Sequence, residues 1–186
     1  GFPETDSGVE LKILKKIFEP EEAELFCELK LKFENVEQIA ERTDRDVDDL
    51  AAMLERMSQR GLVFEVDLEG TKIYKMIPWA FGLYEFQINR LDQEFVELNE
   101  EFAPYFADVF FEHRPSLMRV VPVNQSLEDN QISLPYEQVS AIIEKGVSFG
   151  LNECVCKKEK GILDGGCDKP RDVCLAIAPV PGVFNN

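Results

Sequence analysis

The sequence is short of histidine, of long apolar runs and of cationic side chains, and each shortage excludes a class of protein. Its 186 residues include a single histidine, His113, so chemistry that needs paired histidines is excluded, and His113 is expected at the surface near a helix end. No run of about 18 apolar residues occurs, so we predict no membrane span. The N-terminal segment GFPETDSG lacks the basic region and apolar core of a secretory signal. We therefore expect a reducing, cytoplasmic location, and the initial Gly suggests a trimmed start.

Cationic residues are scarce relative to acidic ones. The chain has 20 Lys and Arg against 36 Asp and Glu, and a formal net charge of −16. Nucleic-acid affinity depends on cations that displace counterions from phosphates, so this balance argues against a nucleic acid as partner. The sequence also has no P-loop, no glycine-rich dinucleotide turn and no nucleophile elbow. We predict that the protein is not an enzyme.

Residues 1–80 have the pattern of a small helical domain that ends in a β-hairpin. Asn35 is a suitable N-cap for a helix over residues 36–43, and two strands are predicted around a turn at Glu69-Gly70. The inward face of a second helix is predicted to comprise Val47, Leu50, Met53, Leu54 and Met57. Helix, turn, helix and hairpin in this order resemble a winged helix-turn-helix, similar to the MarR-like domains.

The charge of that second helix argues against DNA binding. In a DNA-binding winged helix it would enter the major groove. Its start carries one cation, Arg45, among the acidic residues Asp44, Asp46, Asp48 and Asp49. Carboxylates there would face DNA phosphates. We therefore predict a protein-docking or structural module, with DNA binding as the alternative.

Residues 81–114 are predicted to form a connecting segment dominated by a long helix over residues 82–103. Its apolar residues follow the three- and four-residue steps of a coiled-coil seam, namely Tyr84, Ile88, Leu91, Phe95, Leu98 and Phe102. Pro104 is expected to kink or end this helix, and a further helical piece is predicted through Val109 and Phe110. The seam can pack on its own domain or on a second copy of the chain, so a homodimer through helix 82–103 is one of two alternatives.

Four of the five cysteines lie close together, in the segment CVCKKEKGILDGGCDKPRDVC. They are Cys154, Cys156, Cys167 and Cys174, with the spacing C-x-C-x10-C-x6-C. Thiolates are soft anionic ligands, and four of them at one point suit a zinc ion or an iron–sulfur cluster. The spacing alone leaves open a cluster, zinc, or a quartet that is empty or oxidised. The fifth cysteine, Cys27, lies beside an apolar stripe and is predicted to be a small buried hydrophobe.

The residues around the quartet favour an anionic centre. From Cys154 to Cys174, five basic residues outnumber four acidic ones in an otherwise acidic chain, and nearby cations lower the free-energy cost of four thiolates. Gly165-Gly166 would let backbone N–H groups approach sulfur. A helix over residues 136–151 is predicted to lead directly into Cys154 and to fix the first two ligands. Its predicted buried side comprises Tyr136, Val139, Ile142 and Ile143.

The segment GLNECVCKKEKGILDGGCDKPRDVCL resembles a cluster-binding segment of iron–sulfur proteins from anaerobes, in which C-x-C-[RK]-x-x-K…G-C-x-K-P-x-x-x-C-L recurs. The upstream pieces MRVVPV and LPYEQVSAIIEK are also similar to that family, which often has a winged-helix-like region at its N-terminus. The resemblance implies that the four ligands of one 4Fe–4S cluster are Cys154, Cys156, Cys167 and Cys174. Members of the family usually continue into a ferredoxin module, so APVPGVFNN is expected to begin a linker.

The predicted fold class is α+β, mainly helical. It comprises a winged-helix-like domain over residues 1–80, a connecting helix over residues 81–114 and a small metal-binding lobe over residues 115–186, with short strands at 117–123 and 132–134. The predicted function is that of a 4Fe–4S, ferredoxin-like electron-transfer protein or subunit, whose acidic surface steers a redox partner protein. The alternatives are a metal- or redox-sensing transcriptional regulator and a protein in which zinc only stabilises the C-terminal lobe.

Overall fold

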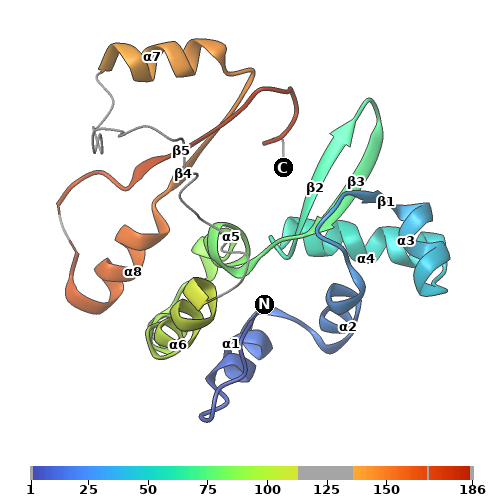
Figure 1. The fold of residues 1–186 in the computed structure, drawn as a ribbon, viewed down its shortest axis with the longest axis horizontal. Coiled ribbons are helices and arrows are strands. Elements are labelled where there is room, and N and C mark those ends of the chain that lie inside the picture. The colour runs from blue at the N-terminus through green and yellow to red at the C-terminus, as the bar shows by residue number, and fades with distance from the viewer. Residues whose placement is uncertain (1, 113–135, 167, 185–186) are drawn as a thin grey trace, which may run out of the picture.

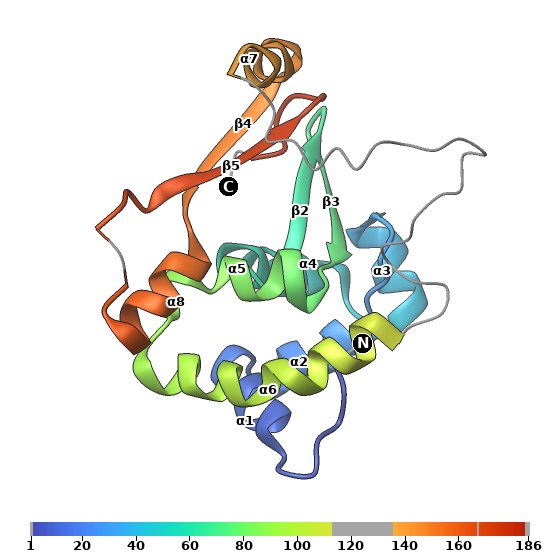
Figure 2. The ribbon, with the colours of Figure 1, turned by 60° about the vertical axis from the view of Figure 1, so that its left-hand side comes forward.

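The computed structural model describes residues 2–112, 136–166 and 168–184. These residues form a mixed helical and antiparallel β structure (Figure 1, Figure 2). The longer helices are α1 (Val9–Ile17), α2 (Pro20–Glu28), α3 (Val36–Thr43), α4 (Val47–Gln59), α6 (Gln93–Glu112), α7 (Tyr136–Lys145) and α8 (Val155–Asp164). The strands are β1 (Glu34–Asn35), β2 (Val63–Leu68), β3 (Thr71–Met76), β4 (Ser148–Glu153) and β5 (Asp172–Ala178). Shorter helical turns between β3 and α6 are a π-helical turn (Trp79–Leu83), α5 (Tyr84–Phe86) and a 3-10 turn (Ile88–Arg90).

At this coarse level the predicted combination of helices with small antiparallel sheets is confirmed. His113 and the strands predicted over residues 117–123 and 132–134 lie outside the described ranges. Within those ranges, no helix combines the length and the apolar character needed to cross a membrane.

Side-chain caps set the starts of α3 and α4. Asn35 Oδ1 accepts a hydrogen bond from the amide of Gln38 at 2.9 Å, and Gln38 Oε1 accepts one from the amide of Asn35 at 3.0 Å. This capping box pairs two N–H groups that would otherwise be free at the start of α3. Asp46 Oδ1 accepts from the amides of Asp48 and Asp49 at 2.9 and 3.1 Å at the start of α4. The two helices predicted here are confirmed.

The predicted strands around Glu69-Gly70 are also confirmed. β2 and β3 form a hairpin in which Leu68 pairs with Thr71, and the sheet order is β1-β3-β2 with antiparallel neighbours. Glu69 and Gly70 have φ angles of 54° and 88°. Two successive residues with positive φ make the two-residue turn whose twist matches that of a hairpin.

Gly61 ends α4 and brings it against the connecting segment. Its φ is 68°, a left-handed conformation that favours glycine, and a Cβ atom there would clash with the Cβ of Phe86 at 2.6 Å. Glycine satisfies both the backbone conformation and the close approach. Gln87 Nε2 donates to the carbonyls of Arg60 and Gly61 at 3.2 Å each. The connecting segment is therefore bound to the end of α4.

One hydrophobic cluster runs through all three predicted parts of the chain. It includes Leu54 of α4, Phe95 of α6 and Val155 of α8. Residues from all three predicted parts share this one core. The division of the chain into three parts at residues 80 and 114 therefore stays a prediction.

Two residues of the N-terminal part that were predicted to be buried are exposed. Val47 is 42% exposed, because it borders a solvent-open hollow between α3 and α4. Cys27 is exposed on α2. The buried side of α2 includes Leu25, and a residue two positions further lies about 200° around the helix axis from it.

The single helix predicted over residues 82–103 is wrong. After the 3-10 turn, Leu91 has extended backbone angles, with φ −66° and ψ 117°. Asp92 Oδ1 then accepts a hydrogen bond from the amide of Phe95 at 2.7 Å. Such an N-cap starts a new helix, α6, rather than continuing an old one.

Of the two effects predicted for Pro104, an end of the helix is wrong, because α6 continues through it to Glu112, and the further helical piece predicted through Val109 and Phe110 is confirmed. Proline removes the amide that would pair with the carbonyl of Glu100. Both Glu100 and Pro104 are exposed, so water can bind that carbonyl and the helix persists.

The predicted coiled-coil seam packs into the chain's own core. Its members are buried or packed against buried residues: Tyr84, Ile88, Leu91, Phe95, Leu98 and Phe102. The α6 helix contacts α1 (Figure 2). Of the two alternatives, the structure therefore shows packing on the same chain, and a homodimer through helix 82–103 would lack a free seam.

The helix predicted over residues 136–151 is wrong beyond Lys145. Gly146 turns the chain there, and a Cβ atom on it would lie 2.6 Å from Ile177 Cγ2 and 2.7 Å from the Phe149 ring. β4 follows and pairs antiparallel with β5. Alternation of apolar and polar residues after Gly146 is typical of a strand.

Other predictions for this lobe are corrected as well. Ile142 and Ile143 are 47% and 38% exposed rather than buried, while the side chains of Tyr136 and Val139 are outside the described set. The segment expected to begin a linker instead turns back on β4. A Cβ atom on Gly150 would lie 3.1 Å from the Phe184 ring.

Candidate metal centre

Two of the four cysteines lie at the start of α8. Cys154 is the N-cap residue, with extended backbone angles and no side-chain cap hydrogen bond, and Cys156 lies in the first turn. The first amides of a helix have no partner within it, and the helix dipole is positive at this end. Such an end stabilises anionic groups. The position of both thiols therefore suits deprotonated sulfur.

Strand pairing brings Cys174 towards the same place. Cys174 of β5 lies opposite Asn152 of β4, two residues before Cys154, which is about 7 Å along a strand. The amide of Cys154 donates to the carbonyl of Arg171 at 2.8 Å. The chain segments that carry these two cysteines are thus bound directly to each other.

Cys167 lies outside the described residues, but Gly166 before it and Pro170 after it contact α8. A Cβ atom on Gly166 would lie 2.9 Å from Gly161 Cα and 3.8 Å from the carbonyl oxygen of Lys157, and its φ is 64°. Lys157 Nζ donates to the carbonyl of Pro170 at 2.8 Å. The loop therefore leaves and returns beside the first turns of α8, close in sequence to Cys156.

Side-chain geometry in the described part of the chain is not that of a closed site. No group of three or more His, Cys, Asp or Glu side chains there could hold a metal ion as placed. Cys154 is partly exposed, and Cys156 and Cys174 are exposed. The structure brings the backbone positions of three predicted ligands near one another, and it does not describe the fourth.

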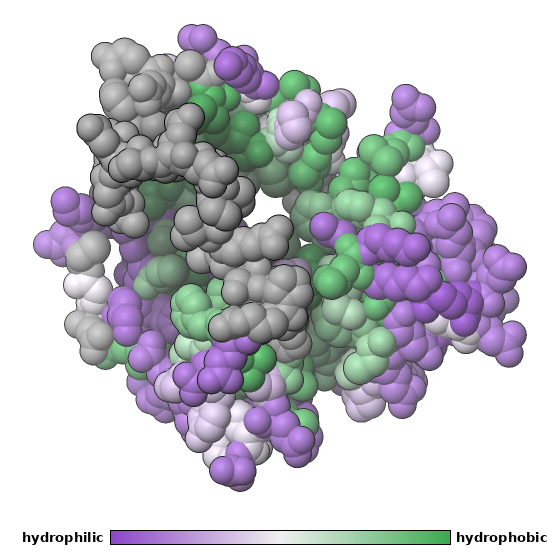
Figure 3. All heavy atoms as spheres, in the orientation of Figure 1, coloured by the Kyte–Doolittle hydropathy of each residue, from purple (hydrophilic) through white to green (hydrophobic). Residues whose placement is uncertain are grey.

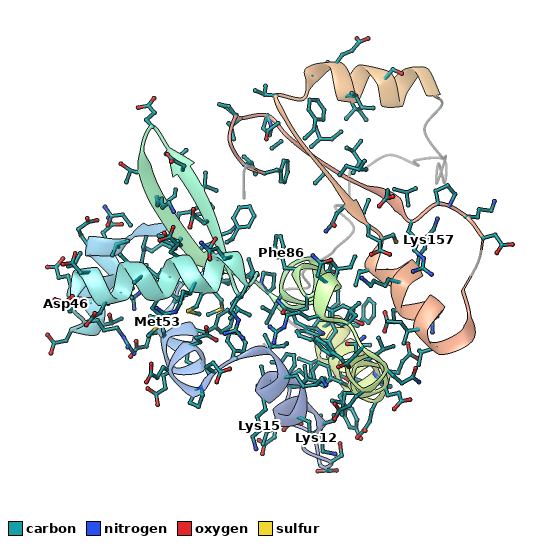
Figure 4. All side chains as sticks on the ribbon, turned by 180° about the vertical axis from the view of Figure 1, so that it is seen from behind. Lys12, Lys15, Asp46, Met53, Phe86 and Lys157 are labelled. Carbon is teal, nitrogen blue, oxygen red and sulfur yellow. The ribbon has the colours of Figure 1, made fainter. Side chains whose placement is uncertain are left out.

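Basic side chains surround the start of α8. Lys158 Nζ lies 3.1 Å from Glu153 and Arg171 lies 3.5 Å from the same carboxylate. These two cations, Lys158 first, hold the pKa of Glu153 below its usual value. Lys157 (Figure 4) donates from Nζ to the carbonyl of Pro170, the residue before Arg171. The cationic surroundings predicted from the sequence are therefore gathered here around one helix end.

The immediate neighbours of Cys156 oppose the effect of the helix end and raise the pKa of its thiol. Burial raises its pKa, and the adjacent Cys154 and the carboxylate of Glu159 raise it further. Metal binding to such a thiol must release its proton.

The α8 helix is fixed to the rest of the protein by its other side. Val155 is 7% exposed and belongs to the shared core. Asn99 Nδ2 of α6 donates to Glu159 Oε1 at 2.9 Å, and Lys160 pairs with Glu100 at 3.2 Å. The cysteines at the start of α8 are therefore positioned by contacts with α6.

Sequence reasoning missed Tyr84 as a residue of this region. It is one of the ionisable groups near Cys156 and Glu159, although it was predicted only as a seam residue. Its burial is recognisable from the apolar spacing, but its proximity to α8 depends on the break in the helix at Leu91, which the sequence pattern did not predict.

Comparison with protein-family models, with curated proteins and with solved structures gave no match.

Proposed function

We propose that the protein binds one 4Fe–4S cluster through Cys154, Cys156, Cys167 and Cys174 and carries single electrons for a redox partner protein. The observation that supports this most is the junction of β4, β5 and α8. There, Cys154 caps α8, its amide is bound to Arg171, and Cys174 lies opposite Asn152. Cys154 and Cys156 thus lie at the positive end of α8, and Cys174 lies on the neighbouring strand near Cys154.

The donor set and its surroundings fit such a cluster. Four thiolates would hold the irons, and free amides at the start of α8 would offset negative charge. Lys157, Lys158 and Arg171 add positive charge within the same region. When bound, the cluster would supply one-electron exchange. The four cysteines would hold it, and the contacts of α8 with α6 would orient it.

Reconstitution separates the cluster from zinc. The purified chain is incubated anaerobically with iron and sulfide, or with zinc, and bound iron, acid-labile sulfide and zinc are measured. A cluster gives broad absorption near about 400 nm that bleaches on reduction. Serine substitution of each of the four cysteines should abolish it, whereas Cys27→Ser, at an exposed position on α2, should not. A colourless chain with one zinc per molecule would contradict the proposal and favour the zinc alternative.

The order α2, β1, α3, α4, β2, β3 supports a winged helix, in which α4 is the second helix of the helix-turn-helix. We propose that this part docks a protein rather than DNA. Three of its cations are engaged by carboxylates or rings. Arg45 pairs with Glu28 at 3.0 Å, Lys72 lies 3.3 Å from Glu65, and Lys75 lies over the Phe33 ring.

The negative charge at the start of α4, where Asp46, Asp48 and Asp49 lie, points to a basic partner for the winged-helix part. Asp46 lies at the outer tip of α4, far from Lys157 (Figure 4). Hydrophilic residues cover the end of the molecule formed by α3 and α4 (Figure 3). Electron transfer to a basic redox protein should therefore slow as ionic strength rises. Salt-sensitive binding of a specific duplex DNA would favour the regulator instead.

A further inference from the structure

The sheet of β4 and β5 has one face of large apolar side chains that are open to solvent. Phe149 of β4 pairs with Ile177 of β5, and Leu151 pairs with Leu175. Residues directly opposite on antiparallel strands share a face, and Val147 follows the same alternation along β4. We call these five residues the ribbon face. The exposed fractions are 56, 46, 67 and 46% for Val147, Phe149, Leu151 and Leu175.

The opposite face of this sheet has a different character. It carries small or polar side chains, among them Asn152, Cys174 and Ala176. The Phe184 ring lies 3.1 Å from the position of a Cβ atom on Gly150, which belongs to this second face. The chain therefore places an aromatic ring of its own on the small-residue face and leaves the ribbon face open. A two-stranded sheet is only marginally stable by itself, so a cover for its apolar face is expected.

The two strands lack the features that keep exposed strands of monomers apart. Such strands are usually protected by charged side chains, by proline or by a bulge. Residues 147–152 and 173–178 contain neither a charged residue nor a proline. The irregularity in the pairing lies at the far end, between Asn152 and Glu153. The ribbon face is therefore suited to a contact between molecules.

The distribution of charge favours a second copy of the chain as the molecule that makes this contact. Residues 2–112 include 27 acidic and 12 basic residues, so two copies repel each other through that part. Residues 136–184 include seven acidic and six basic residues, so two copies can approach each other there without this repulsion. A basic partner of the kind proposed for α4 would find no carboxylate on residues 147–152 or 173–178.

We propose that the protein forms a homodimer in which the ribbon face of one copy packs on the ribbon face of the other. A two-fold axis brings one patch against itself, and packed sheets lie about 10 Å apart. The proposal does not depend on the metal centre, because Cys174 lies on the opposite face of β5. It also differs from a dimer through helix 82–103, whose apolar seam is used within the chain.

The size of the ribbon face predicts a weak dimer. Its open area is roughly 300–400 Å², about that of the largest apolar patch on a typical monomer. Ile142 and Ile143 of α7, which are 47 and 38% exposed, join β4 through Gly146 and extend this area. Two copies would then bury roughly 1,000 Å² in total, which is the lower limit for a specific interface.

The test compares Leu151→Asp with Leu31→Asp by sedimentation velocity of the full chain under reducing conditions. The two leucines are 67 and 68% exposed, and only Leu151 belongs to the ribbon face. The parent should shift from monomer to dimer between about 1 and 500 µM, because an interface this small gives a micromolar or weaker Kd. We expect Leu151→Asp to stay monomeric and Leu31→Asp to behave as the parent. Higher ionic strength should strengthen the dimer, because it screens the repulsion between the acidic parts.

Thermal unfolding followed by circular dichroism, at a concentration where the parent is monomeric, shows whether both variants fold. If Leu151→Asp does not fold, Val147→Asp at the edge of the same face takes its place. A parent that stays monomeric throughout overturns the proposal, as does a dimer that persists in Leu151→Asp. A dimer that weakens with salt overturns it in favour of a contact between the acidic start of α4 and the basic residues of α8. A monomeric parent in which Leu151→Asp is far less stable than Leu31→Asp overturns it in favour of a cover from residues 113–135 of the same chain.

Discussion

Val155→Ala tests whether the cysteine-bearing helix shares its core with the rest of the chain. Val155 lies between Cys154 and Cys156, is 7% exposed and belongs to the shared hydrophobic cluster. The substitution removes two methyl groups, each worth about 0.8 kcal/mol when buried. A cavity that collapses only in part raises the expected loss in unfolding free energy to about 2 kcal/mol. For a chain of this length, that corresponds to a fall in Tm of roughly 4 to 8 °C.

The assay uses the chain's one tryptophan as its probe. Trp79 is 8% exposed and lies in the same cluster, so its fluorescence reports unfolding of the core in urea. The matched control is Val173→Ala, which makes the same chemical change next to Cys174 at a position that is 50% exposed. A surface change of this kind should alter the unfolding free energy by less than about 0.5 kcal/mol.

Two results would refute this reasoning. If Val155→Ala left the Trp79 transition unchanged, the C-terminal lobe would unfold separately and the contact of Val155 with the core would carry no stability. If Val155→Ala and Val173→Ala lowered the unfolding free energy equally, burial of the side chain at position 155 would not be the cause of the loss. A transition that splits into two steps in the parent chain would support the predicted division into separate domains.

Three further predictions follow from single contacts. Gly166→Ala should weaken metal binding and lower the unfolding free energy more than Gly165→Ala does. Both glycines have positive φ, but only a Cβ atom on Gly166 would clash with the backbone, 2.9 Å from Gly161 Cα. Equal losses of metal affinity in the two variants would contradict this prediction. Glu22→Gln should lower the unfolding free energy by about 1 kcal/mol. The Glu22 carboxylate is 7% exposed and accepts a charge-assisted hydrogen bond from Arg60, and the substitution replaces that carboxylate by a neutral amide acceptor. Urea unfolding measures the change, with Glu24→Gln at an exposed position as the control. For Glu34, burial alone would raise the pKa, but hydrogen bonds from Arg42 and Lys30 outweigh it and hold the pKa below the usual 4.5. The contribution of the Glu34 carboxylate to stability is therefore complete above about pH 4.5 and is lost as the pH falls through the lower folded-state pKa. Urea midpoints measured from about pH 6 to 3 should fall less steeply in Glu34→Gln than in the parent chain.

The N-terminal part of the fold was predictable because its signals are local. The cap at Asn35, the acidic cap at Asp46 and the turn at Glu69-Gly70 each act within a few residues. Such contacts need no knowledge of distant packing. The predicted helices and hairpin in this region therefore agree with the structure.

The connecting segment was predicted wrongly because its signal is ambiguous. Steps of three and four residues describe a coiled-coil seam, but they also describe any helix whose apolar side faces a core. The pattern continues through Leu91 even though the backbone there is extended. Asp92 was a potential N-cap, and weighing it against the apolar spacing would have located the start of α6.

The error after Lys145 matters most for the chemistry, because it reverses the helix end presented to the cysteines. The predicted helix would have ended at Cys154, where carbonyl groups and the negative end of the dipole would oppose thiolates. In the structure, β4 leads in and Cys154 begins α8 as its N-cap, so the positive end of the helix dipole lies at Cys154 and Cys156. Four ionised thiolates are costly in water-poor surroundings unless such charge offsets them. The strand that the sequence reading missed is thus what makes an anionic metal centre at these cysteines physically reasonable.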